Sequence, residues 1–341
     1  LGVRLHVTGT TTFTAAVQGI TPASASGLEA LYATALTALL GDDSPARDIN
    51  VVVTARTSPA IRVSLRTHVL TASGQGRGRG AIIAPALTTL TVANATSDSD
   101  PGVGGASGGA ARHERLVYAW PGERTYVPEA LNFRLKTADG MTTADGILDM
   151  RTDFRVASII SNLAPERNPA QTAEPIPTLM SSVLAFQRGV SGLGLNEYTA
   201  LRAAGVMALR LDRTSGPIFQ SGITTSLISG EKNINRRRMA DFIEDSLAER
   251  LVSFSKLPLT QRLKDAAVGE ARAFMNELLS PNNTAAQRID AFQVDGVSGN
   301  TPALEAKGIY VIIVRVRLTP TADFIVLQAE IGENVVIQQA A

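Results

Sequence analysis

Residues 48–87 read DINVVVTARTSPAIRVSLRTHVLTASGQGRGRGAIIAPAL, and this stretch decides the fold class. It opens on a β-branched apolar run, continues in SPAIRVSLRTHVL with apolar residues at helical spacing, and ends on a second apolar run after RGRG. β-Branched runs favour strands, and apolar residues every three or four positions favour an amphipathic helix. The order strand, helix, strand predicts two parallel strands joined by a crossover helix.

The chain on either side continues this alternation. Residues 1–20 are rich in Val and Thr and predict strands, and residues 28–40 predict a helix that ends at Gly41. Downstream, ERLVYAWPG at 114–122 predicts a buried strand, and mixed strands and helices follow it up to a proline-rich stretch at 161–178. We therefore expect a mixed α/β protein with helices around a β-sheet.

The proline-rich stretch predicts a boundary between an α/β domain at 1–178 and an α+β domain at 179–341. Within the first domain, TSDSDPGVGGASGGAA at 96–111 has almost no residue able to pack, so it predicts a mobile surface loop. The second domain is predicted to hold helices at 196–204, 235–251 and 261–279, and strands at 206–211, 310–318, 323–331 and 334–339.

Composition excludes several classes of function. The chain of 341 residues has no cysteine, which excludes disulfides, thiolate metal sites and cysteine nucleophiles. Its 32 basic and 31 acidic residues leave a net charge of +1, so no global charge draws it to nucleic acid. The apolar run at 308–314 is far shorter than the roughly 20 residues of a membrane span, so we expect no membrane insertion. The chain starts at Leu1 without a signal pattern, and we expect a missing N-terminal arm.

No group of residues predicts catalysis, a cofactor or a metal. The histidines, His6, His68 and His113, are far apart and match no metal-binding spacing. GQGRGRG at 74–80 has the glycines of a phosphate loop, but it lacks the GK[ST] ending and precedes a strand instead of a helix. We expect a helix end followed by flexible glycines there, and a protein that is not an enzyme.

Three consecutive arginines open the helix predicted in NINRRRMADFIED at 233–245. Because helical residues turn by about 100 degrees each, Arg236, Arg237 and Arg238 fan out and make no single anion-binding patch. Arg236 lies on the side of the apolar stripe, where we expect a buried or interfacial carboxylate partner. Arg237 and Arg238 lie on the other side, within reach of Asp241. The stripe consists of Met239, Phe242, Ile243, Leu247 and Leu251.

Cations at a helix N-terminus oppose the helix dipole, and local ion pairs contribute only a few tenths of a kcal/mol each. We therefore expect a partner outside this helix. Arg236, Arg237 and Arg238 are candidates for inter-subunit contacts, and a solvated charged helix end remains the alternative for Arg237 and Arg238.

The order of these segments resembles that of a contractile tail sheath protein, found in myovirus tails and related contractile injection machines. The most specific part is LGLNEYTALRAAGVMALRLDRTSGPIFQSGITTSL at 193–227 followed by NINRRRMADFIEDSL at 233–247. DINVVVTARTSPAIRVSLRTHVL, LVYAWPG and LAPERNPAQ also resemble the family. The resemblance extends over roughly 45–341.

The resemblance implies a structural protein without chemistry of its own. Family members stack as hexameric rings around an inner tube, and contraction drives the tube through a target envelope. The implied partners are further copies of the chain, the inner tail tube protein, and baseplate and tail terminator proteins, with no direct contact to nucleic acid. The implied location is the virion, and the host cytoplasm during assembly.

The resemblance also implies that terminal arms add strands to a neighbour's sheet. NVVIQQ at 334–339 suits this role, with Val335, Val336 and Ile337 in the arm 333–341. The receiving sheet is expected to include 309–318 and 323–331. The alternative is a terminal strand that pairs within its own chain.

A helix of the C-terminal domain contacts the tube in this family. The helix at 261–279 is the candidate, through Arg262, Lys264 and Arg272, against the alternative of a solvated face. Three other functions remain open: the sheath of a non-viral injection system, a nucleotide-binding α/β enzyme, and a nucleic-acid-binding module.

Overall fold

The computed structural model describes eleven segments of the chain. They are residues 25–41, 49–54, 58–85, 91–98, 112–126, 147–171, 183–187, 192–212, 216–228, 230–280 and 287–319. The strands predicted in 1–20, 323–331 and 334–339 lie outside these residues.

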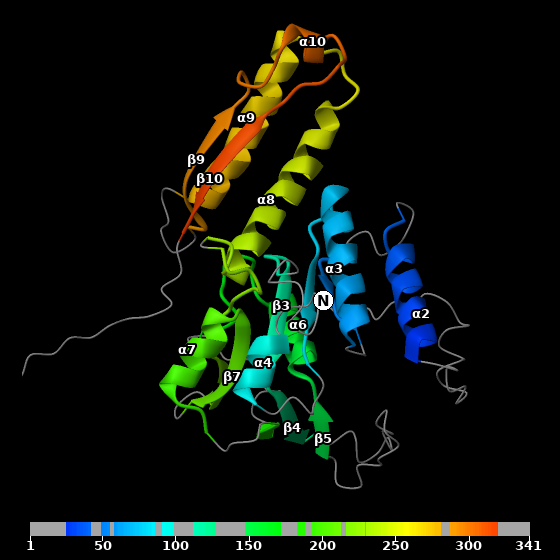
Figure 1. The fold of residues 1–341 in the computed structure, drawn as a ribbon. Helices are drawn as coiled ribbons and strands as arrows, with labels where there is room; N and C mark the ends of the chain where they lie inside the picture. The colour runs from blue at the N-terminus through cyan, green and yellow to red at the C-terminus, as the bar shows by residue number, and fades with distance from the viewer. Residues whose placement is uncertain are drawn as a thin grey trace, which may run out of the picture.

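A five-stranded sheet forms the centre of the part that we call the body, residues 25–233 (Figure 1). Its strands are β1 (Val51–Val52), β2 (Gly80–Ile83), β3 (Leu116–Trp120), β7 (Val206–Asp212) and β8 (Gly216–Phe219), in the order β1-β2-β3-β7-β8. The first four strands are parallel, and β8 returns antiparallel to β7. The predicted parallel pair with a crossover helix is confirmed, since β1 and β2 are parallel and joined by α3 (Pro59–Gly74).

Helices cover both faces of this sheet, because alternate residues of each strand point to opposite sides. Leu116, Tyr118 and Trp120 belong to one core cluster, while Val117 and Ala119 belong to the other. The helices that contribute to the first cluster are α2 (Ala25–Ala38), α3, α4 (Val92–Asp98) and α7 (Leu195–Ala203). The second cluster holds α6 (Thr152–Asn162). The expected mixed α/β fold is therefore confirmed.

A small antiparallel sheet continues from the end of β3. Its strands are β4 (Gly122–Tyr126), β5 (Ile147–Met150) and β6 (Val183–Gln187), in the order β5-β4-β6. A buried ion pair joins this small sheet to helix α6, which packs on the five-stranded sheet. Arg155 of α6 donates to Glu123 of β4 at 2.5 Å. Burial raises the pKa of Glu123, and the Arg155 guanidinium offsets only part of that rise.

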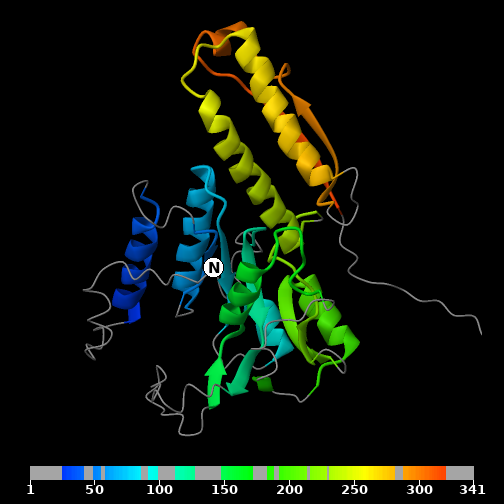
Figure 2. The same cartoon turned by 180° about the vertical axis from the view of Figure 1, so that it is seen from behind.

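The residues from 234 to 319 form an arm that projects from the body (Figures 1 and 2). Helix α8 (Ile234–Leu251) runs outward, a short 3₁₀ turn follows at Val252–Phe254, and α9 (Gln261–Leu279) returns. A hairpin of β9 (Ile289–Asp295) and β10 (Ile313–Leu318), interrupted by α10 (Pro302–Glu305), packs against α9. The arm has its own apolar core, built on Met239, Ile243, Phe274, Met275 and Val294 among others.

Three details differ from the sequence prediction. Thr96–Asp98 end helix α4 instead of opening a loop, and 99–111 lie outside the described residues. Strands from both sides of residue 178 share the five-stranded sheet, because β7 returns to pair with β3. Finally, β10 pairs with β9, a strand that the sequence reading missed.

Candidate functional site

The arginine triplet lies where the arm leaves the body, at the first turn of α8. Asn233 stands at the N-cap position without a side-chain capping bond, so the helix start is held by other contacts. Ile234 packs in the body's second core cluster, and the Asn235 amide donates to the Glu166 carbonyl at 3.1 Å. We call the polar contacts around this turn the joint.

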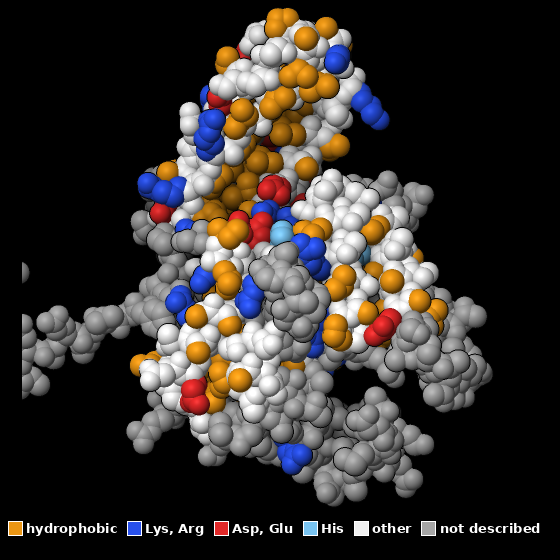
Figure 3. Space-filling model, viewed as in Figure 1, with side chains coloured by type: hydrophobic (Ala, Val, Ile, Leu, Met, Phe, Trp, Pro, Cys, Tyr) orange, Lys and Arg blue, Asp and Glu red, His pale blue; other side chains and the backbone are white. Residues whose placement is uncertain are grey.

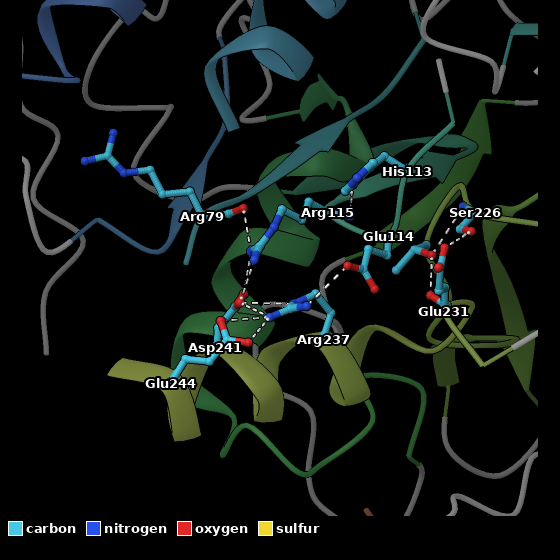
Figure 4. Close-up of polar contacts among 10 residues, drawn as sticks. Arg79, His113, Glu114, Arg115, Ser226, Glu231, Arg237, Asp241 and Glu244 are labelled. Atoms are coloured by element: carbon cyan, nitrogen blue, oxygen red, sulfur yellow. Dashed lines mark hydrogen bonds and ion pairs between the residues drawn. The ribbon is translucent and has the colours of Figure 1, made fainter. Parts of the chain in front are cut away.

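Asp241 is the centre of the joint (Figure 4). Arg115, which precedes β3, donates to both Asp241 oxygens at 2.7 and 2.9 Å. From within α8, Arg237 donates to the same carboxylate at 2.6 Å. Arg115 is only 6% exposed, so its charge is compensated inside the protein. Asp241 therefore links the body and the arm through a forked, charge-assisted contact.

Arg237 has two further carboxylate partners, Glu114 of the body and Glu244 of α8, each at 3.2 Å (Figure 4). Burial by itself lowers the pKa of Arg237, but Asp241, Glu244 and Glu114 together outweigh it and raise the pKa. The predicted local pair with Asp241 is present. Arg237 also has a partner outside α8, as expected, and this partner is Glu114 of the same chain.

Arg238 binds carbonyls instead of carboxylates. Its guanidinium donates to the carbonyl oxygens of Leu163 at 2.6 Å, Ile160 at 3.0 Å and Ala164 at 3.3 Å, at the C-terminal end of α6. Burial lowers the pKa of Arg238 to about 10. The last carbonyls of a helix lack intrahelical partners and carry partial negative charge. Arg238 thus caps α6 and fixes α8 to it.

Within its own chain, Arg236 donates to the Gly230 carbonyl at 3.2 Å. The sequence predicts a buried or interfacial carboxylate partner, and a carboxylate of a neighbouring subunit stays a prediction. The Arg236 side chain is half-buried, so water supplies part of its solvation and a carboxylate of the same chain is not required. The inter-subunit role of Arg236, Arg237 and Arg238 stays a prediction, but the joint occupies all three guanidinium groups within the chain.

A further arginine, missed by sequence reasoning, closes the joint on its other side. Arg288, just before β9, pairs with Glu166 of the body at 2.6 Å, and its guanidinium lies 4.6 Å from the centre of the Phe242 ring. Arg115, Glu114 and Glu166 were missed as well. Their partners lie more than a hundred residues away in the chain, so no local spacing indicates them.

The joint also explains one glycine of the GQGRGRG stretch. A Cβ atom at Gly78 would lie 2.7 Å from the Cβ of Asp241, a distance that real side chains do not adopt. The stretch brings its backbone against α8, and the Arg79 carbonyl accepts a bond from Arg115 (Figure 4). This glycine therefore serves close packing and not phosphate binding.

The joint is polar, while the body and the arm each have an apolar core of their own. All residues of the arm's core cluster come from the arm itself. In the space-filling view, acidic and basic side chains gather where α8 leaves the body, below the apolar surface of the arm (Figure 3). The orientation of the arm therefore depends largely on directional charged contacts.

The predicted tube-facing residues lie on α9, which has the predicted bounds. Arg262 and Arg272 are exposed. Lys264 is engaged within the arm, because its ammonium group lies 2.5 Å from Glu305 and 5.7 Å from the centre of the Tyr310 ring. The other predicted contact residues, Val335, Val336 and Ile337, lie outside the described residues.

Among the described residues, no group of three or more His, Asp or Glu side chains is placed to hold a metal ion. None of the described helices combines the length and the apolar character that a membrane crossing requires.

Solved structures of contractile sheaths have the same fold. No protein-family model and no curated protein matches the chain. The contracted helical sheath of the anti-feeding prophage (AFP) matches with a TM-score of 0.62 and 15% identity, over 91% of this chain and 75% of that chain. The contracted PVC sheath complex of an extracellular contractile injection system matches with a TM-score of 0.61 and 14% identity, over 90% and 80%. A sheath tail protein from Desulfitobacterium hafniense matches with a TM-score of 0.52 and 12% identity, over 84% and 59%. The chain therefore has the sheath fold.

Proposed function

We propose that the chain is the subunit of a contractile sheath, which polymerises as stacked hexameric rings around an inner tube and contracts to drive the tube through an envelope. The supporting observation is the fold, shared over about nine tenths of the chain with two sheaths in the contracted state. The work of contraction then comes from rearrangement of subunits and not from catalysis.

The joint suits this role because a sheath must transmit force from subunit to subunit. Three arginine contacts connect α8 to two parts of the body. Arg115 and Glu114 in the turn before β3 bind Asp241 and Arg237 of α8, and Arg238 of α8 binds the end of α6. A body and an arm fixed in this way move as one piece. Rearrangement is then confined to the contacts between subunits.

The hairpin of the arm suits strand exchange. Within the described residues its sheet has only two strands, and each pairs with a single neighbour. We propose that the C-terminal segment 333–341 of a neighbouring copy adds a strand to this hairpin through backbone hydrogen bonds, with Val335, Val336 and Ile337 in the added strand. The alternative, pairing with its own chain, is distinguished by the truncation described in the Discussion.

Contact with the tube is proposed for the exposed cations of α9. Replacing both Arg262 and Arg272 by Glu is expected to reduce co-sedimentation with assembled tube roughly tenfold at low salt, because the contact depends on complementary charge. Lys264 is left in place, since it already pairs with Glu305.

The control is Lys307→Glu, an equal change of charge per site at an exposed side chain outside α9 and outside the hairpin strands. This variant is expected to co-sediment like the unmodified protein. Unchanged co-sedimentation of the double α9 variant would instead show that Arg262 and Arg272 face solvent and do not contact the tube.

A sheath of a non-viral injection system is the second candidate. Two of the similar structures, AFP and PVC, come from contractile injection systems, and both match over more of their length than the Desulfitobacterium sheath tail protein does. In either setting the proposed partners are copies of the chain, the tube, and baseplate and terminator proteins. The proposed location is a phage virion or an extracellular injection particle, with assembly in the producing cell's cytoplasm.

A further inference from the structure

Helix α2 is the outermost element of the body, and it lies against α3 in both ribbon views (Figures 1 and 2). Its C-terminal end faces the GQGRGRG stretch. The Arg77 guanidinium donates to the Leu40 carbonyl at 2.9 Å, and the Arg79 guanidinium donates to the Leu39 carbonyl at 3.0 Å. The two arginines of this stretch therefore cap the end of a helix.

These bonds complete the hydrogen bonding at this end of α2. The carbonyls of residues 35, 37 and 38 accept bonds from the backbone N–H groups of Leu39, Leu40 and Gly41. The carbonyls of residues 36, 39 and 40 accept bonds from the side chains of His68, Arg79 and Arg77. Side chains of α3 and of the glycine-rich stretch thus hold half of these last carbonyls.

His68 lies at the centre of this cap and is only 2% exposed. One ring nitrogen, Nδ1, is 2.8 Å from the Leu36 carbonyl, and the other, Nε2, is 3.0 Å from the Arg79 guanidinium. A guanidinium only donates and a carbonyl only accepts. The imidazole must therefore be neutral, with its proton on Nδ1 and an acceptor lone pair on Nε2.

We propose that His68 is an acid-sensitive latch, whose protonation at Nε2 breaks its bond with Arg79 and loosens helix α2 from the body. The added proton removes the acceptor and places an imidazolium against a guanidinium inside the protein. Displacement of Arg79 also removes its bond to the Leu39 carbonyl. The bonds of Arg77 to the Leu40 carbonyl and of His68 Nδ1 to the Leu36 carbonyl then remain to hold α2, together with its apolar packing.

The surroundings of His68 favour the neutral imidazole. Burial, and after it the charge of Arg79, lower the pKa of His68, while the bond to the Leu36 carbonyl opposes this effect. Burial, and after it the charge of the neighbouring Arg77, lower the pKa of Arg79. Among the described residues, no carboxylate counteracts the lowering of the His68 pKa.

The direction of the pH effect follows from linkage. The pKa of His68 is lower in the folded than in the unfolded chain. The contribution of His68 to the docking of α2 is therefore complete above the ordinary imidazole pKa, and it is lost as the pH falls through the lowered pKa of His68. A single proton changes the docking equilibrium of α2 by at most about tenfold per pH unit.

Hydrogen exchange measured by mass spectrometry tests this inference on the full chain. Between pH 7.5 and 4.5, after correction for intrinsic rates, the amides of residues 30–40 are expected to lose protection by up to about tenfold per pH unit. The strand β3 serves as an internal reference, and its protection is expected to change less. His68→Gln, whose amide supplies one donor group and one acceptor without titrating, is expected to remove the pH dependence.

The control variant is His113→Gln, because His113 is the other described histidine whose pKa is lowered by burial. It is expected to keep the pH dependence of the unmodified chain. If His68→Gln does not fold, the imidazole resonances of the unmodified protein are followed by NMR, and their midpoint must coincide with loss of protection in α2. Protection of residues 30–40 that is constant down to pH 4.5, or equal loss in His68→Gln, would overturn the inference.

Discussion

Assembly into sheath is expected to be lost when residues 333–341 are deleted, while the isolated subunit still folds. The added strand would contribute several backbone hydrogen bonds, each worth about 1 kcal/mol net, to a contact that repeats at every subunit. Its loss therefore leaves no continuous connection along the polymer. Sedimentation and negative-stain microscopy of the truncated and complete proteins measure the difference.

Deletion of Ala340 and Ala341 alone is the matched control, because it leaves NVVIQQ at 334–339 complete. This shorter deletion is expected to assemble normally. Long sheaths from the 333–341 deletion would contradict strand exchange. A fall of several kcal/mol in the unfolding free energy of the isolated truncated subunit would instead place the strand in its own chain.

Asp241→Asn is expected to lower the free energy of unfolding by about 3–5 kcal/mol, the cost of leaving a buried cation without its carboxylate. Arg115 loses both of its bonds to a charged partner, and Arg237 loses its shortest bond. Denaturant unfolding of the purified subunit measures this change.

Glu244→Gln is the matched control, because Glu244 also pairs with Arg237 but its side chain is 66% exposed. Its expected cost is below about 1 kcal/mol, as for other solvent-exposed ion pairs. Equal stability of the two variants would show that the joint does not depend on Asp241.

The local elements of this fold were predictable from the sequence, because periodicity and end signals act over a few residues. Helix α9 has its predicted bounds, and Thr260 caps it by accepting a bond from the Leu263 N–H. The crossover unit at 48–87 was predictable for the same reason. Strand β9 was missed, since IDAFQVD has neither strict alternation nor a continuous apolar run.

The joint was predictable only in part. Helical geometry indicated that the three arginines diverge, and the pair between Arg237 and Asp241 follows from their spacing. The unfavourable position of three cations at a helix N-terminus indicated a partner outside the helix. The partners of Arg238 are backbone carbonyls at the end of α6. Every residue has a carbonyl group, so the sequence does not indicate which of them binds an arginine. The contact of Arg115 with Asp241 spans 126 residues, so only the tertiary fold brings the two together.

Negative-stain electron microscopy of the purified 341-residue chain, alone and with assembled inner tube, distinguishes a sheath subunit from a protein that does not polymerise. A sheath subunit is expected to form cogwheel-like rings or hollow striated tubes, with the chain surrounding the inner tube when both are present. A chain that stays monomeric at every concentration, and that leaves the tube bare, would contradict the proposed function.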